Sequence, residues 1–120
     1  ARGEGTRMEL RNPDPAANPY LALAVCLAAG LHGIKENLMP PASVDENVFD
    51  LSEEHREQNG ICSIPENLSK AIEAMKHDSL IKETLGTHIF EKYIEAKESE
   101  WRNYRTIITQ WELDNYLLTY

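Results

Sequence analysis

Polar and apolar side chains alternate over residues 6–11 and then give way to a long apolar stretch. Period-two alternation predicts a half-buried β-strand over residues 6–11, with Arg7, Glu9 and Arg11 on one side. Pro13 begins the turn that follows it. The rest of the sequence contains no second convincing strand pattern, so we expect this strand to pair with a segment outside the chain.

The apolar stretch predicts a helix over residues 18–38. Asn18 is a suitable N-cap, and Pro19 fits the first helical position because its missing N–H is not needed there. The side chains of this helix are apolar on nearly every face, which predicts a helix buried on all sides. A chain of 120 residues has few elements with which to surround it.

The second half of the chain is predicted to be helical. Residues 42–65 are predicted to form a loop that contains one solvated helical turn, and residues 67–108 are predicted to form helices interrupted at Gly86. The last of these carries an apolar stripe at helical spacing: Phe90, Tyr93, Ile94, Trp101, Tyr104 and Ile108. The fold class predicted from these patterns is mainly α with one N-terminal β-strand.

A final short helix is predicted over residues 109–120. It carries more apolar surface than a free terminus usually does, from Trp111, Tyr116, Leu117, Leu118 and Tyr120. Two interpretations remain open. The helix either docks onto the core of its own chain or lies in a groove of another subunit.

Composition narrows the class of protein. The formal net charge of −8 opposes non-specific binding to nucleic acid or to an anionic membrane. The longest apolar run, residues 20–31, is shorter than the roughly 20 residues that a membrane-spanning helix needs. Cys26 and Cys62 fit a reduced intracellular protein. The polar start at Ala1 leads us to expect a piece of a larger cytosolic protein.

The candidate chemistry lies on the predicted strand. Arg7, Glu9 and Arg11 are either a solvated row of paired charges or a functional group of residues. In the functional interpretation, the carboxylate binds a hard cation and the guanidiniums hold anionic substrate groups, as phosphoryl transfer requires. One carboxylate does not make a metal site, so further ligands would come from other sequence. The four histidines show no metal-ligand spacing.

The motif Arg-x-Glu-x-Arg followed by PDPAANPYL and then by AGLHGIK resembles the C-terminal part of type I glutamine synthetase, and in detail the shorter, α-type bacterial enzymes. The resemblance covers essentially the whole chain. It implies the C-terminal part of an α+β catalytic domain, in which the strand is one stave of a β-barrel shared between subunits. Further matching stretches are Asp45–Leu51, Ile94–Glu98 and Trp111–Glu112.

The resemblance implies a cytoplasmic, ATP-dependent ligase that joins ammonium to L-glutamate through a γ-glutamyl phosphate. Glu9 then corresponds to a ligand of a catalytic Mg²⁺ or Mn²⁺. Arg11 corresponds to a catalytic residue that contacts the glutamate substrate and its transferring phosphoryl group, and Arg7 to an arginine near the ATP phosphates. The family assembles as a dodecamer of two stacked hexamers, in which the helix over residues 109–120 would reach the opposite ring.

Two further expectations and two alternatives accompany this resemblance. Family members controlled by adenylylation carry a tyrosine where this chain has Phe49, so we expect that regulation to be absent and feedback inhibition by glutamine to replace it. We also expect the 120-residue chain alone to be inactive. The alternatives are a γ-glutamyl ligase acting on another amine, and a non-catalytic helical interaction module.

Overall fold

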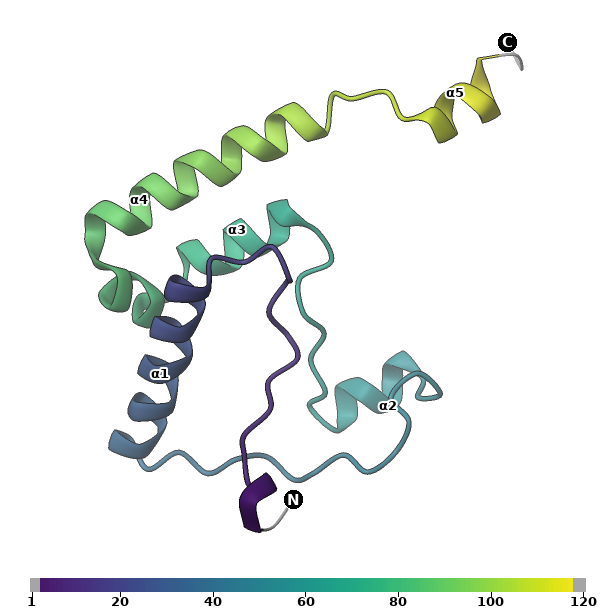
Figure 1. Cartoon of the computed structure of the whole chain (residues 1–120). Helices are drawn as coiled ribbons and strands as arrows, with labels where there is room; N and C mark the ends of the chain where they lie inside the picture. The colour runs from purple at the N-terminus through teal and green to yellow at the C-terminus, as the bar shows by residue number, and fades with distance from the viewer. Residues whose placement is uncertain (1–2, 118–120) are drawn as a thin grey trace. The chain divides into compact units, whose positions relative to one another are not determined.

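The computed structural model of the chain describes residues 3–117, and within that range all the regular secondary structure is helical (Figure 1). The chain divides into two compact units, Ala1–Ile64 and Pro65–Tyr120. The elements in chain order are the 3₁₀ turn η1 (Gly3–Gly5) and the helices α1 (Pro19–Lys35), α2 (Glu53–Gln58), α3 (Leu68–Lys76), α4 (Ser79–Tyr104) and α5 (Gln110–Tyr116).

Helix α1 begins and ends where its local sequence directs. The Asn18 side chain accepts hydrogen bonds from the backbone N–H groups of Tyr20 and Leu21, at 3.0 and 3.3 Å, which confirms Asn18 as the N-cap. The helix ends at Lys35, and Asn37, two residues beyond it, adopts a φ of 52° in the left-handed region. The following N–H, on Leu38, donates to the Gly33 carbonyl at 2.9 Å and closes the last turn.

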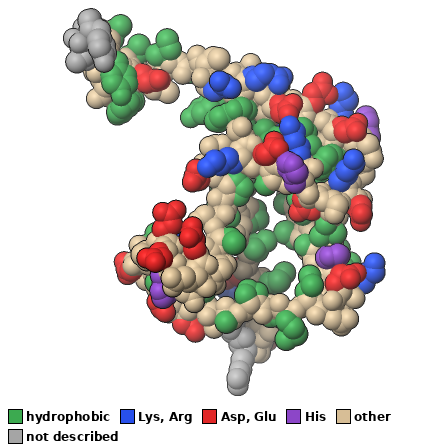
Figure 2. Space-filling view, turned by 180° about the vertical axis from the view of Figure 1, so that it is seen from behind, with side chains coloured by type: hydrophobic (Ala, Val, Ile, Leu, Met, Phe, Trp, Pro, Cys, Tyr) green, Lys and Arg blue, Asp and Glu red, His purple; other side chains and the backbone are tan. Residues whose placement is uncertain are grey.

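The predicted burial of this helix is not found. Within the described chain α1 has no buried residue, and its large apolar side chains are mostly exposed (Figure 2). The exposed members include Leu23, Leu27, Leu31 and Ile34. The apolar face of α1 thus lacks helices to pack against within its own unit, because the described residues of that unit form only one other α-helix, the six-residue α2.

The N-terminal β-strand is also not found. Residues 6–12 have an irregular backbone and form neither a helix nor a strand within the described chain. A strand is defined by ladder hydrogen bonds to a neighbour, and the described chain supplies none. The alternating pattern indicates that the segment favours an extended backbone. A β-ladder also requires a neighbouring strand, which local sequence does not provide.

The residues predicted as a loop over 42–65 include one short helix. The Ser52 hydroxyl accepts a hydrogen bond from the His55 N–H at 3.2 Å and caps the start of α2. After its end, Gly60 adopts a φ of 65°, and the Ile61 N–H returns to the Arg56 carbonyl at 2.8 Å. The helical turn predicted here is confirmed.

The second unit is built on the pairing of α3 with α4 (Figure 1). Ile72 on α3 and Phe90 on α4 are its buried apolar residues among those described. The Asn67 side chain accepts from the Lys70 N–H at 3.0 Å to start α3, and the Asp78 side chain accepts from the Ile81 N–H at 3.1 Å to start α4. Local caps thus place both helices, and one small apolar contact region joins them.

Gly86 interrupts α4 as the sequence predicts. It adopts φ 73° and ψ 154°, which is not a helical conformation, so α4 consists of two helical parts joined at a kink. The second part ends at Tyr104 rather than at the predicted residue 108, and residues 105–109 link it to α5. Residues 118–120 of the predicted last helix lie outside the described residues.

Candidate functional site

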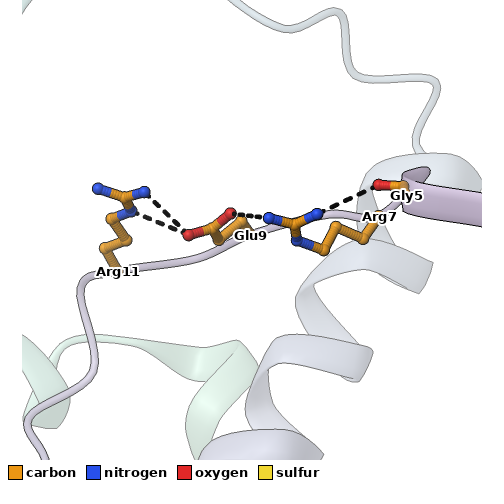
Figure 3. A network of polar contacts seen from close by, with 4 residues as sticks. All are labelled: Gly5, Arg7, Glu9 and Arg11. Carbon is orange, nitrogen blue, oxygen red and sulfur yellow. Dashed lines mark hydrogen bonds and ion pairs between the residues drawn. The ribbon is translucent and has the colours of Figure 1, made fainter. Parts of the chain in front are cut away.

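Arg7, Glu9 and Arg11 lie together on one side of the segment after η1, as their spacing predicts (Figure 3). Side chains two residues apart in an extended chain point the same way, so the backbone brings the three charges within reach of one another. The structure confirms this geometry without a β-ladder.

The Glu9 carboxylate bridges the two arginines. Its Oε1 accepts from Arg11 Nε at 3.1 Å and from Arg11 Nη2 at 2.9 Å, and its Oε2 accepts from Arg7 Nη2 at 3.2 Å. These are charge-assisted hydrogen bonds, in which both partners are ionised. The row therefore carries two positive charges and one negative charge, with the carboxylate between the guanidiniums.

Arg7 has an additional contact that the sequence does not reveal. Its Nη1 donates to the Gly5 carbonyl at 3.3 Å, so Arg7 is held from both Glu9 and η1 (Figure 3). Backbone carbonyls belong to every residue and carry no sequence signature, which is why the pattern did not identify Gly5. This contact links the Arg7 side chain to the backbone of η1.

All three side chains remain open to solvent. The side chains of Arg7, Glu9 and Arg11 are 65%, 48% and 85% exposed. Exposed ion pairs contribute little to stability, roughly 0–1 kcal/mol each. The arrangement is therefore better suited to exchanging partners than to holding the fold together.

Glu9 has the donor chemistry of a hard-cation ligand but does not make a metal site alone. Carboxylate oxygens are the ligands that Mg²⁺ and Mn²⁺ prefer. Among the described residues, no group of three or more His, Cys, Asp or Glu side chains lies close enough to hold an ion. Glu9 thus fits a shared site as one ligand among several.

A second polar region lies elsewhere in the first unit. A cavity of about 250 Å³ lies between residues 41–46 and α2, and Asp45, Glu46 and His55 are among its lining residues. Asp45 accepts from the Ser43 hydroxyl at 3.1 Å, and these titratable groups do not form a metal-binding cluster. The cavity therefore lacks the paired opposite charges that distinguish the segment with Glu9.

The turn that follows this cavity presents Phe49. Asn47 holds the turn, since its carbonyl accepts from the Asp50 N–H at 3.0 Å and its side chain donates to the Asp50 carboxylate at 2.8 Å. The Phe49 side chain at the tip is 92% exposed. The side chain at position 49 is thus accessible to solvent but bears no hydroxyl.

Helix α5 begins with a capping box and exposes large apolar side chains to solvent. The Thr109 hydroxyl accepts from the Glu112 N–H at 3.3 Å, while the Glu112 carboxylate accepts from the Thr109 N–H at 2.8 Å. These contacts with Thr109 lower the pKa of Glu112. Trp111 and Tyr116 meet edge to face, with ring centroids 5.5 Å apart, yet both side chains are mostly exposed.

Among the described residues of the second unit, α3 contacts α4, and α5 makes no comparable contact with either helix. No described helix is long and apolar enough to span a lipid bilayer.

Comparison with known proteins identifies the family of enzymes to which this chain belongs. Residues 1–116 match the family model of the glutamine synthetase catalytic domain, and the chain belongs to that family.

Individual relatives agree with this assignment. The chain is 52% identical over its whole length to a glutamine synthetase from Clostridium saccharobutylicum. It is 50% identical over 98% of its length to one from Thermotoga maritima, and 47% identical over 99% to one from Thermus thermophilus. In each case the match covers 27% of the relative, so the chain spans about a quarter of the length of the curated relatives it matches.

Proposed function

We propose that a full-length protein containing this chain forms L-glutamine from L-glutamate and ammonium with hydrolysis of ATP. The γ-carboxylate of glutamate attacks the γ-phosphorus of ATP, which releases ADP and gives γ-glutamyl phosphate. Ammonia then attacks the activated carbonyl carbon and releases inorganic phosphate. The names of the relatives and the family match support this reaction.

The three charged residues receive distinct roles. Arg11, with its planar fork of N–H donors, binds the glutamate substrate and meets the charge of the transferring phosphoryl group as the catalytic residue. Arg7 binds the ATP phosphates. Glu9 would supply one oxygen ligand to a Mg²⁺ or Mn²⁺, and that cation would neutralise charge on the phosphate oxygens.

One observation carries this proposal beyond the family match. The Glu9 carboxylate lies between two guanidiniums, within 3.2 Å of both. Phosphoryl transfer requires a cation ligand and anion-binding donors side by side, because charge accumulates on the transferring oxygens. The position of one carboxylate between two guanidiniums supports the functional interpretation of these three residues.

The exposed surfaces are explained by the same proposal. The segment over residues 6–11 pairs as a strand in a β-barrel formed with other parts of the protein and with a neighbouring subunit. The apolar α1 packs beneath that barrel, and α5 reaches the opposite ring of a cytoplasmic dodecamer. The exposure of Leu23 and Leu27 on α1, and of Trp111 on α5, supports these partners.

The direct test is product analysis with the full-length protein and with the 120-residue chain. The full-length protein with L-glutamate, ATP, ammonium and Mg²⁺ should form glutamine, ADP and phosphate in equal amounts. The isolated chain should form none, because it spans only about a quarter of its relatives. Phosphate release without glutamine would contradict the proposal.

The same assay separates the alternative functions. Replacing ammonium with primary alkylamines identifies a γ-glutamyl ligase for another amine if those amines are consumed faster than ammonium. A non-catalytic interaction module would form no product with any amine, even as a full-length, assembled protein. We expect ammonium to be the preferred acceptor.

A further inference from the structure

The carboxylate that is proposed to bind a cation is already occupied by cationic side chains. Glu9 Oε1 accepts two N–H groups of Arg11, at 3.1 and 2.9 Å, and Oε2 accepts one from Arg7 at 3.2 Å (Figure 3). A carboxylate oxygen has two lone-pair sites, so the accepting capacity of Oε1 is filled and that of Oε2 is half used.

A metal ion and the guanidiniums therefore compete for Glu9. Direct coordination places Mg²⁺ about 2.1 Å from a carboxylate oxygen. With Arg11 still bonded to the same carboxylate, two like-charged groups would lie only a few ångströms apart, which is unfavourable even in water. Cation binding at Glu9 requires these pairs to open.

Opening the ion pairs with Glu9 affects the two arginines differently. Arg7 keeps its bond to the Gly5 carbonyl at 3.3 Å, so its guanidinium stays oriented. For the Arg11 guanidinium, Glu9 is the partner that the described structure provides, and its side chain is 85% exposed. A released Arg11 presents a planar fork of donors that matches a phosphate or a carboxylate.

We propose that Arg7 and Arg11 form an exchangeable cover on Glu9, so that cation binding at Glu9 and anion binding at the arginines favour each other. This inference rests on the proposed function for the identity of the cation ligand. When the cation takes the carboxylate, the arginines gain free donors, and when an anion takes the arginines, the carboxylate is uncovered. Because linkage is reciprocal, each ligand raises the affinity for the other by the same factor.

The cover has a distinctive signature in the absence of any anionic ligand. Removing the Arg11 charge should tighten cation binding, although Arg11 is not a cation ligand. The experiment is a titration of the full-length protein with Mn²⁺ alone, followed by electron paramagnetic resonance, and then with Mn²⁺ and inorganic phosphate. The Mn²⁺ that is lost in Glu9→Gln defines the relevant site.

We expect Arg11→Gln to raise the Mn²⁺ affinity of that site about three- to tenfold without phosphate, and to abolish the further gain that phosphate gives the wild type. Arg11→Lys keeps the charge but loses the fork, so it should raise the Mn²⁺ affinity less than Arg11→Gln. Arg102→Gln is the matched control, since Arg102 lies on α4 and pairs with Glu98 at 3.9 Å. It should leave both affinities unchanged.

The outcomes separate this inference from the proposed function. If Glu9→Gln weakens Mn²⁺ binding but Arg11→Gln leaves it unchanged or weaker, the cover is wrong and the role of Glu9 stands. If Glu9→Gln leaves Mn²⁺ binding unchanged, Glu9 is not a cation ligand and the proposed role fails. Should Arg11→Gln not fold, Arg11→Lys decides, since an affinity equal to or below that of the wild type overturns the cover.

Discussion

At the scale of single residues, Glu9 and Phe49 show how side-chain chemistry limits function. Glu9 accepts from two guanidiniums, so in its proposed role as a cation ligand the cation competes with those guanidiniums for its carboxylate. Phe49 occupies an exposed turn but offers no oxygen for modification. Both consequences follow from one functional group and its immediate neighbours.

The Phe49 position makes a direct prediction about regulation. Adenylylation needs a hydroxyl nucleophile, and a phenyl ring has none, so incubation of the full-length protein with an adenylyltransferase and ATP should attach no AMP to residues 45–51. Phe49→Tyr restores a phenolic oxygen at a position that is 92% exposed and should become labelled. Mass spectrometry of this peptide measures the outcome, and stoichiometric AMP on the wild type would refute the prediction.

Sequence patterns predicted local features well and non-local ones poorly. Asn18 caps α1 as predicted, and Asn67 and Thr109 cap α3 and α5 in the same way, because a cap depends on contacts within about three residues. The strand over residues 6–11 and the buried state of α1 were not found, since each needs a partner that local sequence does not contain.

The same distinction applies to the candidate site. Spacing placed Arg7, Glu9 and Arg11 on one side of the chain, because side-chain direction in an extended segment follows from position alone. It did not predict the Gly5 carbonyl on Arg7, which depends on the local turn η1. The role of the charges came from the family resemblance, because spacing alone also allowed a solvated row.

At the scale of elements, the second unit depends on a kink and on one ion pair between helices. Gly86 lets α4 change direction, and Lys76 on α3 bonds Glu98 on α4 at 2.8 Å. Ile72 and Phe90 are the buried residues among those described. Because this apolar contact is small, we expect the Gly86 kink and the Lys76–Glu98 ion pair to contribute much to the arrangement of α3 against α4.

The backbone of Gly86 makes the first prediction at this scale. A φ of 73° with a ψ of 154° lies in a region that is essentially restricted to glycine. Gly86→Ala should destabilise the chain by about 1–3 kcal/mol in urea titrations followed by circular dichroism. No atom lies within 4 Å of a Cβ added there, so the cost comes from the backbone and not from a clash.

Gly30→Ala is the control for this substitution. Gly30 lies within α1, and an added Cβ there also meets no atom within 4 Å. In a helix interior, alanine is favoured over glycine by roughly 0.5–1 kcal/mol, so Gly30→Ala should leave stability equal or higher. Equal effects of the two substitutions would show that Gly86 imposes no backbone requirement.

The Lys76–Glu98 pair predicts a pH dependence. The hydrogen bond from Lys76 lowers the pKa of Glu98 below 4.5, and the bond to Glu98 raises the pKa of Lys76 above 10.5. Because the pKa of Glu98 is lower in the folded state than in the unfolded state, its ionised form stabilises the fold at pH values above the unfolded-state pKa. This stability is lost as the pH falls through the folded-state pKa. The lysine contribution is present below pH 10.5 and is lost as pH rises through its raised folded pKa.

Hydrogen exchange of α3 amides measures this pair. Glu98→Gln should speed exchange at pH 7, and the difference from the wild type should vanish in acid once the wild-type Glu98 is protonated. Glu95→Gln is the matched control, because Glu95 pairs with Lys92 inside α4 at 2.7 Å and does not join two helices. Faster α3 exchange in Glu95→Gln than in Glu98→Gln would contradict the account.

At the scale of the whole molecule, the chain presents exposed apolar surfaces. Large apolar side chains of α1 and α5 are open to solvent (Figure 2), and the segment over residues 6–11 forms no strand within the described residues. Membership of the glutamine synthetase catalytic domain family explains these surfaces as parts of a larger fold, because the chain spans about a quarter of its relatives. In the proposed function, the chain forms one wall of a shared active site.

The measurement that tests this account most directly is the rate of ATP-dependent glutamine formation by full-length protein carrying Glu9→Gln. Losing a cation ligand at a phosphoryl-transfer site should lower kcat/KM about 100-fold or more. Glu4→Gln, on the nearby turn η1, is the control and should retain wild-type activity. Wild-type activity in Glu9→Gln would contradict the assignment of Arg7, Glu9 and Arg11 to the active site.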